Sequence, residues 1–147
     1  MRTFGGVVNH RRMRLRMELF VEDMDVSVRF YRDVLGFQVD RRAEDYVSLR
    51  RGVVGLGLGP VAKLPEQTEG QGFTRQRLNG DKGAGVEIVL ELDGLDELRA
   101  LYEHCQQRAE ISEDLRLRSW GLHDFRLADP DGYYLRITHG NSAAQEG

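Results

Sequence analysis

Two stretches of the chain share one pattern of apolar and polar residues. From Leu15 to Val21, apolar residues occupy alternate positions, which predicts a strand with one buried face. The same alternation runs from Val86 to Leu92. Apolar residues at helical spacing follow each stretch, at Val26, Phe30 and Val34 in the first copy and at Leu95, Leu98, Leu101, Tyr102 and Cys105 in the second. The pattern therefore predicts a strand–helix unit that occurs twice.

The two copies are related by an offset of 71 positions, which aligns Asp25 with Asp96 and Tyr31 with Tyr102. We expect Asp25 to be the N-cap of the first helix and Gly36 to end it. Tyr31 and Tyr102 are expected in the core. Three short strands are expected after each helix, at about Phe37–Arg42, Tyr46–Arg50 and Val53–Leu58 in the first copy and at about Ile111–Arg118, His123–Ala128 and Tyr133–Thr138 in the second.

The order of elements predicts an α+β fold of two βαβββ modules in tandem. Each helix would cover the outer face of its sheet, so the opposite faces of the two sheets are free to form a cup, a usual place for a small-molecule site. The expected divisions are an N-terminal leader (1–13), a first module (14–59), a long loop rich in Gly, Gln, Lys and Pro (60–83), a second module (84–138) and a C-terminal tail (139–147), with 14–138 forming one domain.

Composition excludes several classes of function. The formal net charge is -3, from 21 basic and 24 acidic residues, so no strong field favours nucleic acid as a partner. No run of 18 apolar residues is present, so we expect no membrane span. The single cysteine, Cys105, excludes an internal disulfide and is typical of the reducing cytoplasm. Its place on the apolar side of a predicted helix indicates a buried structural thiol.

Three segments occur in order along the chain: VEDMDVSVRFYRDVLGF (Val21–Phe37), GVEIVLELDGLDEL (Gly85–Leu98) and SWGLHDFRLADPDGYYLRI (Ser119–Ile137). Together they resemble the vicinal oxygen chelate superfamily, which includes glyoxalases, extradiol dioxygenases and bleomycin-resistance proteins. The last segment is similar to the tail of the bleomycin-resistance and glyoxalase-like members. The resemblance extends from about Leu15 to Thr138 and implies the fold, whereas the same fold serves unrelated chemistries.

The resemblance also identifies where a metal would bind. Enzymes of this family hold one divalent metal through His or Glu side chains from the first and last strands of each module. The matching positions here are Arg16, Glu87, Gly57 (or Leu56 in a shifted register) and Arg136. A guanidinium group has no lone pair to offer a metal. The resemblance therefore implies that this chain binds neither a metal nor another cofactor.

If the match holds, Arg16, Glu87 and Arg136 converge as an ion triad in place of the metal. The triad would clamp the modules together, or its surplus positive charge would bind an anionic or carbonyl group of a ligand, or both. Strand alternation places Gly55 and Gly57 on the cup face, where they leave room. The other candidate ligand-binding residues are Glu18, Phe20, Val89 and Tyr134 on strands, Trp120 at the rim, and His123.

These features favour a metal-free small-molecule-binding protein, similar to the bleomycin-resistance branch, that sequesters an antibiotic or related metabolite as a cytoplasmic homodimer. The alternative is a lyase, isomerase or dioxygenase of the same superfamily with an atypical metal site. An enzyme that uses Glu87 as a base is a variant of that alternative, although flanking arginines would hold the carboxylate ionised. A third possibility is an interaction module whose cup is vestigial.

Overall fold

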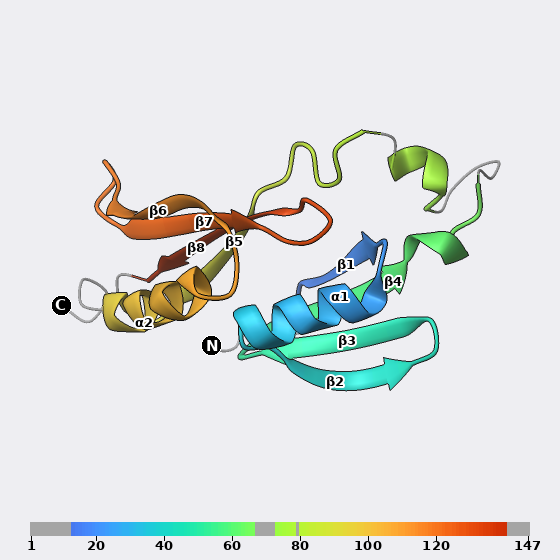
Figure 1. The fold of residues 1–147 in the computed structure, drawn as a ribbon, viewed down its shortest axis with the longest axis horizontal. Coiled ribbons are helices and arrows are strands. Elements are labelled where there is room, and N and C mark those ends of the chain that lie inside the picture. Colours follow the sequence, from blue (N-terminus) through green and yellow to red (C-terminus); the bar gives the residue numbers. More distant parts are fainter. Residues whose placement is uncertain (1–12, 67–72, 79, 141–147) are drawn as a thin grey trace, which may run out of the picture.

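The computed structural model describes residues 13–66, 73–78 and 80–140, and the structural statements below concern these residues. The predicted leader lies outside them except for Met13, and the predicted tail lies outside them beyond Gly140. Two βαβββ modules follow one another along the chain (Figure 1). Their elements are β1 (Arg16–Val21), α1 (Met24–Arg29), η2 (Phe30–Val34), β2 (Gln38–Ala43), β3 (Tyr46–Arg51) and β4 (Val54–Pro60), then β5 (Ile88–Leu92), α2 (Leu95–Gln106), β6 (Ile111–Leu117), β7 (His123–Ala128) and β8 (Tyr134–His139).

Each module forms a four-stranded mixed sheet with one helix on its apolar face. The strand orders are β1-β4-β3-β2 and β5-β8-β7-β6, and in each sheet the first strand pairs in parallel with the last. The predicted α+β fold class is therefore confirmed. Two short 3-10 turns, Val61–Lys63 and Arg75–Leu78, lie in the segment predicted as a long loop.

The first helix differs from the prediction at its start and in the side that it buries. Its N-cap is Asp23, whose backbone is extended and whose carboxylate accepts the Val26 N–H at 3.1 Å, so the predicted cap at Asp25 is wrong. The helix continues into η2, a π-helical turn that shifts the buried side to Val28, Tyr31 and Val34. Val26 is consequently exposed, contrary to the predicted apolar side.

The second module follows the prediction more closely. In α2, Leu98 and Cys105 are fully buried, and the other predicted apolar positions pack against the core. β1 begins one residue later than predicted and β5 begins two residues later. Leu15 and Val86, the predicted first residues, precede the paired residues and are exposed. Among the described residues, no helix is both long enough and apolar enough to cross a bilayer.

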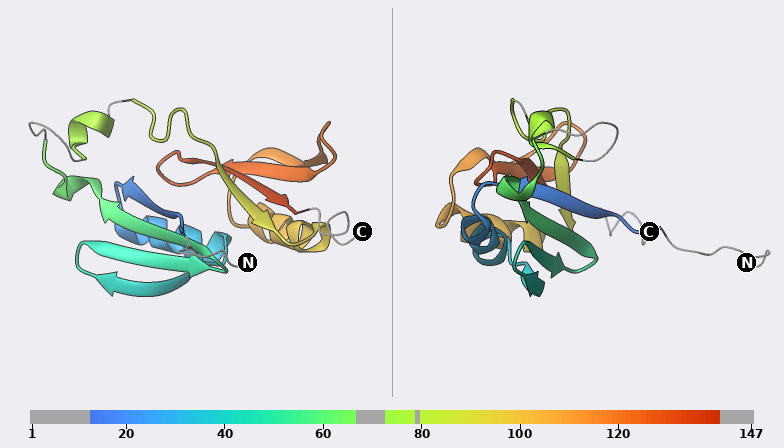
Figure 2. Two further views of the ribbon diagram at one scale, coloured as in Figure 1. Left: turned by 180° about the vertical axis from the view of Figure 1, so that it is seen from behind. Right: turned by 90° about the vertical axis from the view of Figure 1, so that its right-hand side faces the viewer.

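The modules contact each other through their helices and through the turn between β7 and β8. The Tyr31 hydroxyl donates to buried Asp129 at 2.6 Å, and the Cys105 thiol donates to the Val34 carbonyl at 3.4 Å. The Tyr133 hydroxyl donates to the Phe20 carbonyl at 3.0 Å. Figure 2 shows the two sheets from behind and from the side. Because these contacts use the helix side of each module, the opposite, polar faces of the two sheets remain open.

Candidate functional site

The polar face of the first module has a floor of glycine. Along β4, Leu56 and Leu58 are buried in the core, while Gly55, Gly57 and Gly59 lie on the opposite side. Successive side chains of a strand point to opposite faces, so the alternation in VGLGLGP leaves one face of this central strand without side chains. The neighbouring strands β1 and β3 supply the walls of the resulting hollow.

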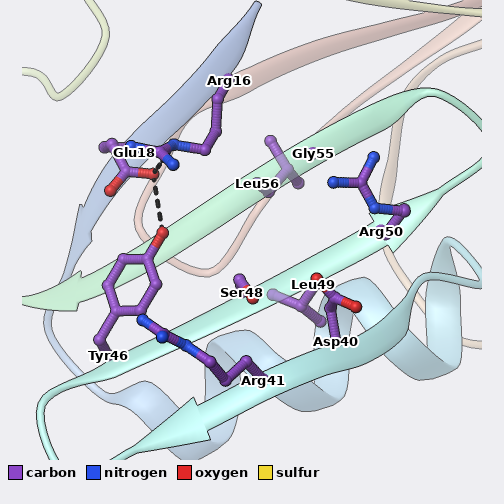
Figure 3. Close-up of a pocket in the computed structure, with 10 residues that line it drawn as sticks. All are labelled: Arg16, Glu18, Asp40, Arg41, Tyr46, Ser48, Leu49, Arg50, Gly55 and Leu56. Carbon is purple, nitrogen blue, oxygen red and sulfur yellow. Dashed lines mark hydrogen bonds and ion pairs between the residues drawn. The ribbon is translucent and has the colours of Figure 1, made fainter.

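The hollow has a volume of about 510 Å³, within the range of small-molecule sites (Figure 3). Charged and polar side chains surround it: Arg16, Glu18, Asp40, Arg41, Tyr46, Ser48 and Arg50. The Tyr46 hydroxyl donates to Glu18 at 3.1 Å, and Glu18 also pairs with Arg16 at 3.5 Å. Burial and the bond to Glu18 raise the pKa of Tyr46. A Cβ at Gly57 would overlap both the Glu18 carboxylate and the Tyr46 hydroxyl, so glycine permits this bond.

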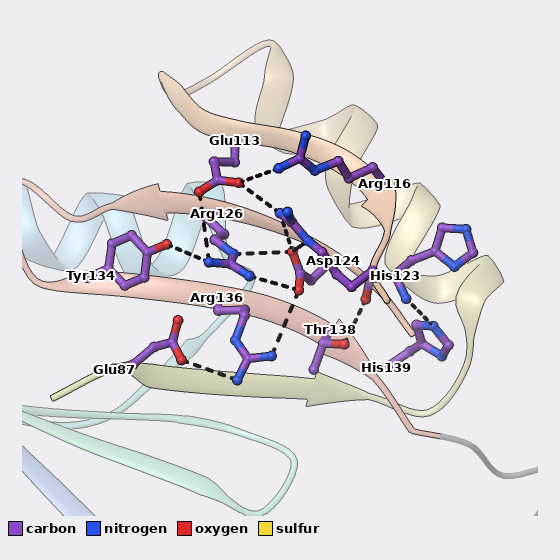
Figure 4. Close-up of polar contacts among 11 residues, drawn as sticks. Glu87, Glu113, Arg116, His123, Asp124, Arg126, Tyr134, Arg136, Thr138 and His139 are labelled. Atoms are coloured by element: carbon purple, nitrogen blue, oxygen red, sulfur yellow. Dashed lines mark hydrogen bonds and ion pairs between the residues drawn. The ribbon is translucent and has the colours of Figure 1, made fainter. Parts of the chain in front are cut away.

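The polar face of the second module is filled rather than hollow. Its central strand β8 carries Tyr134, Arg136 and Thr138 in the register that Gly55, Gly57 and Gly59 occupy in β4. The fully buried carboxylate of Asp124 lies at the centre of this face (Figure 4). Three arginines surround it, with nitrogen–oxygen distances of 2.7 Å from Arg118, 3.3 Å from Arg126 and 3.8 Å from Arg136.

The ionisation of Asp124 follows from these neighbours. Burial alone would raise the pKa of Asp124, but hydrogen bonds from Arg126 and Arg118 outweigh burial and hold the pKa below its ordinary value. The bond to Asp124 raises the pKa of Arg126 further above neutrality. The cluster is therefore fully charged at neutral pH. Arg136 joins the cluster through an ion pair of 3.8 Å with Asp124, and its buried Nε has no hydrogen-bond partner among the described residues.

The ion triad expected from the sequence is not formed within one chain. Arg136 pairs with Glu87 at 3.2 Å, as expected, but Arg16 pairs with Glu18 of its own module. The modules contact each other on their helix sides, so the two polar faces share no ion pair among the described residues. Trp120 is 56% exposed, and its ring centroid lies 5.9 Å from the Arg136 guanidinium carbon. Arg136 thus joins Glu87 and Trp120 in one cluster.

The remaining predicted residues lie in different places. Phe20 stacks on Phe73 with centroids 4.3 Å apart, beside Gly59. Val89 pairs with Arg136 across the sheet and is exposed, and Tyr134 accepts a hydrogen bond from Arg126 at 3.2 Å.

His123, another candidate ligand-binding residue, does not lie on the polar face of the second module. It shares the strand face of buried Phe125, and its ring lies 5.9 Å from that of His139. His123 therefore lies on the apolar side of β7, apart from the other candidate ligand-binding residues, because alternation along β7 gives the polar face to Asp124 and Arg126.

Sequence reasoning missed most of the charged residues of both faces. In the second module it missed Asp124, Arg118 and Arg126, although alternation along the predicted strand His123–Ala128 would have found two of them. In the first module it missed Arg41 and Arg50. Alternation along the predicted strand Tyr46–Arg50 would have placed Arg50 opposite the apolar Val47 and Leu49. No sequence signal placed Arg41 there, because its orientation depends on the register shift at Asp40.

The donor set does not fit a metal at the positions that the resemblance identified. Leu56 is buried in the core and Gly57 lies on the polar face, which identifies Gly57 as the matching residue. Arg16 and Arg136 are cations without a lone pair, and Gly57 has no side chain, so Glu87 is the one donor among the four. Within the described ranges, no three His, Cys, Asp or Glu side chains are grouped so that they could hold a metal ion.

Comparisons with known proteins show which folds and which family this chain is similar to. Similar solved structures include lactoylglutathione lyase from Agrobacterium tumefaciens (16% identity, covering 91% of this chain and 97% of that chain, TM-score 0.69). A glyoxalase/bleomycin resistance protein/dioxygenase from Nocardioides is 20% identical, with 90% of this chain and 85% of that chain covered and a TM-score of 0.69. TioX from Micromonospora sp. ML1 is 19% identical, with 87% of this chain and 98% of that chain covered and a TM-score of 0.67. These identities show the fold alone. No curated protein sequence matches the chain. The model of the glyoxalase/bleomycin resistance protein/dioxygenase superfamily matches residues 14–137, and the chain belongs to this superfamily.

Proposed function

We propose that this protein binds an antibiotic or a related small metabolite without a metal and sequesters it rather than converting it. The observation that carries the proposal is that arginine side chains occupy two of the positions at which the family's enzymes have metal ligands. Arg16 and Arg136 stand where the family's enzymes hold metal ligands, and each is already paired with a carboxylate, Glu18 or Glu87. A guanidinium in such a place recognises carboxylate, phosphate or carbonyl oxygen atoms through directed hydrogen bonds.

We further propose that the site is completed in a homodimer. The hollow face of the first module and the filled face of the second are opposite in shape, and each remains open in one chain. The filled face also exposes the apolar side chain of Val89, which pairs with Arg136, and the Trp120 ring lies exposed beside the Arg136 guanidinium. A second copy that laid its filled face over the hollow would cover these side chains and bring Arg136 of one chain towards Arg16 of the other. The single, buried Cys105 is compatible with action in the reducing cytoplasm.

Two measurements test the function. Elemental analysis after incubation with zinc, nickel, manganese and iron should show no stoichiometric metal. A screen of glycopeptide antibiotics and anionic metabolites, followed by Trp120 fluorescence, should find ligands, because a molecule bound beside Arg136 changes the surroundings of the indole. Analytical ultracentrifugation of the same samples should show a dimer.

Two results would contradict the proposal. One tightly bound metal ion per chain would favour a lyase, isomerase or dioxygenase with an atypical metal site. A screen without any ligand would favour a vestigial module. Arg136→Ala distinguishes a contact from a clamp: loss of binding with an unchanged unfolding midpoint indicates a contact, and a lowered midpoint with retained binding indicates a clamp.

A further inference from the structure

We infer that the hollow of the first module binds a small carboxylate that also carries a hydroxyl or amino group, with the carboxylate on Arg50 and the donor on Asp40. The inference rests on the proposed function, because it names the ligand class of one of the two faces described above. The two residues that it assigns to the ligand, Arg50 and Asp40, do not occupy the family's metal positions.

The charge of the hollow calls for one negative charge on the ligand. Three arginines and two carboxylates line it, which leaves a surplus of one positive charge. The Arg16 charge is offset by Glu18 at 3.5 Å. Among the described residues, Arg50 has neither a carboxylate partner nor a hydrogen-bond acceptor, and Arg41 packs against the Tyr46 ring at 5.9 Å without one. The unneutralised cations of the hollow are therefore Arg41 and Arg50.

The glycine floor gives Arg50 its position. Gly55 lies between Arg16 on β1 and Arg50 on β3 in one row across three adjacent strands. A Cβ at Gly55 would lie 3.6 Å from Arg50 Nη2 and 3.9 Å from Arg16 Cγ. The two side chains therefore flank an open space directly above the backbone of β4. A planar carboxylate placed there can accept both N–H groups of one edge of the Arg50 guanidinium.

A β-bulge supplies the acceptor for the second group of the ligand. The register of β2 against β3 shifts between Val39 and Arg41. In a regular strand, neighbouring residues point to opposite faces, but here both Asp40 and Arg41 line the hollow. Asp40 makes no hydrogen bond or ion pair with another described side chain. Its carboxylate, which lines the same hollow as Arg50 (Figure 3), can therefore accept a hydrogen bond from a hydroxyl or amino group of the same ligand.

The experiment uses 4-hydroxybenzoate as the probe, with benzoate lacking the donor and 4-hydroxybenzamide lacking the charge. Each is titrated into the full-length protein and followed by the backbone amide resonances of Gly55 and Ser48. We expect 4-hydroxybenzoate to bind about tenfold or more tightly than 4-hydroxybenzamide, because a hydrogen bond to a charged group is lost with the amide. Benzoate should bind more weakly than 4-hydroxybenzoate, and Asp40→Asn should reduce that difference.

Two substitutions and one control localise the site. Arg50→Gln should weaken 4-hydroxybenzoate binding about tenfold or more. Gly55→Ala should weaken it while leaving Arg50 in place, since the added Cβ takes up part of the open space and lies 3.6 Å from Arg50 Nη2, an ordinary contact. Arg42→Gln is the matched control, because Arg42 is an exposed arginine of β2 that pairs with buried Val47 rather than with Ser48. A native amide spectrum of each variant shows that it is folded.

The inference is overturned if 4-hydroxybenzoate does not bind, if the amide binds equally well, if folded Arg50→Gln binds normally, or if the shifted resonances lie in the second module. None of these results bears on the proposed function, because the broad ligand screen and metal analysis decide that separately. Conversely, a screen without ligands combined with carboxylate binding at Gly55 would place the binding site on the first module alone.

Discussion

Asp124 shows how a single buried charge can organise one face of the molecule. Its side chain is fully buried, and a buried carboxylate is unfavourable unless cations and hydrogen bonds compensate for the lost water. Arg118, Arg126 and Arg136 come from a loop and two strands, and Asp124 is the one group that all three contact. The position of Arg136 on the polar face thus depends on a residue that no ligand can reach.

Removing this carboxylate should destabilise the protein strongly. We expect Asp124→Ala to lower the free energy of unfolding by about 3–5 kcal/mol, because it removes the fully buried carboxylate that three arginines share and leaves them only the more exposed Glu113 and Glu87. Asp124→Asn should cost less, since an amide oxygen can still accept one guanidinium bond. The control is Asp114→Asn, which replaces an exposed aspartate bonded to Tyr102 and should change the unfolding free energy by less than about 1 kcal/mol. Urea unfolding of the three variants measures the differences.

The loss of stability caused by Asp124→Asn should depend on pH in a defined way. The pKa of Asp124 is lowered in the folded state, so its contribution is present above the ordinary carboxylate pKa and is lost as the pH falls through the folded value. The difference between the wild type and Asp124→Asn should therefore be constant from pH 7 to pH 5. It should shrink below about pH 4. A difference that shrank between pH 7 and pH 5 would mean that the folded carboxyl has a raised pKa instead.

At the scale of elements, the two modules show one architecture put to two uses. The parallel pair β1–β4 and the parallel pair β5–β8 have the same register, yet glycine faces outward from β4 and large polar residues face outward from β8. All eight strands were predicted to within two residues at their ends, the first strand of each module from apolar alternation, which reflects burial of one face, and the other six from short strand-forming runs after each helix. It could not predict the π-helical turn after α1 or the bulge at Asp40, since both arise from packing and pairing with distant residues.

The end of the first helix provides a test at this scale. Gly36 has a φ of +77°, in the left-handed region. A Cβ added there would lie 3.0 Å from Arg51 Nη1, the atom that donates to the Leu35 carbonyl at 2.6 Å. We expect Gly36→Ala to lower the unfolding free energy by about 1–2 kcal/mol, the usual strain of a side chain in the left-handed region. Gly59→Ala is the control, because its Cβ would lie 3.8 Å from Phe20, an ordinary contact.

The two glycine substitutions should change the unfolding free energy in opposite directions. An alanine in an extended strand loses less backbone entropy on folding than glycine, so Gly59→Ala should raise the unfolding free energy by about 0.5 kcal/mol. Both values come from urea unfolding with equal slopes. Equal losses in the two variants would indicate that Gly59 serves the approach of Phe20 and Phe73 rather than an ordinary strand position.

At the scale of the whole molecule, the contact between the modules was the part least accessible from the sequence. The segment Asp129–Gly132 was expected only as the connection between two predicted strands, and no pattern indicated that it would contact the other module. There, buried Asp129 accepts the Tyr31 hydroxyl, and Asp131 contacts the start of α1. Burial raises the pKa of Asp129, and the Tyr31 bond partly offsets this rise. Periodicity identifies which side of an element is apolar, but it does not say which other element covers that side.

Cys105 reports on this contact. Its thiol is fully buried, donates to the Val34 carbonyl of the other module, and has a pKa raised by burial to about 11. The thiolate is the reactive form, so we expect the native protein to resist thiol reagents at pH 8. Labelling then requires an opening that exposes the thiol, either separation of the modules or global unfolding. The rate of labelling compared with the unfolding free energy distinguishes these two routes.

Tyr31→Phe should open the contact. It leaves a buried Asp129 oxygen without its donor, a loss of about 1–3 kcal/mol, and should speed Cys105 labelling by about 5- to 150-fold. Tyr102→Phe is the matched control, because Tyr102 occupies the equivalent helix position but bonds to exposed Asp114 within its own module.

Asp124→Asn weakens the second module away from the contact. If modules separate locally, Tyr31→Phe accelerates labelling more than Asp124→Asn does at equal loss of global stability, whereas equal acceleration would mean that the modules unfold as one unit.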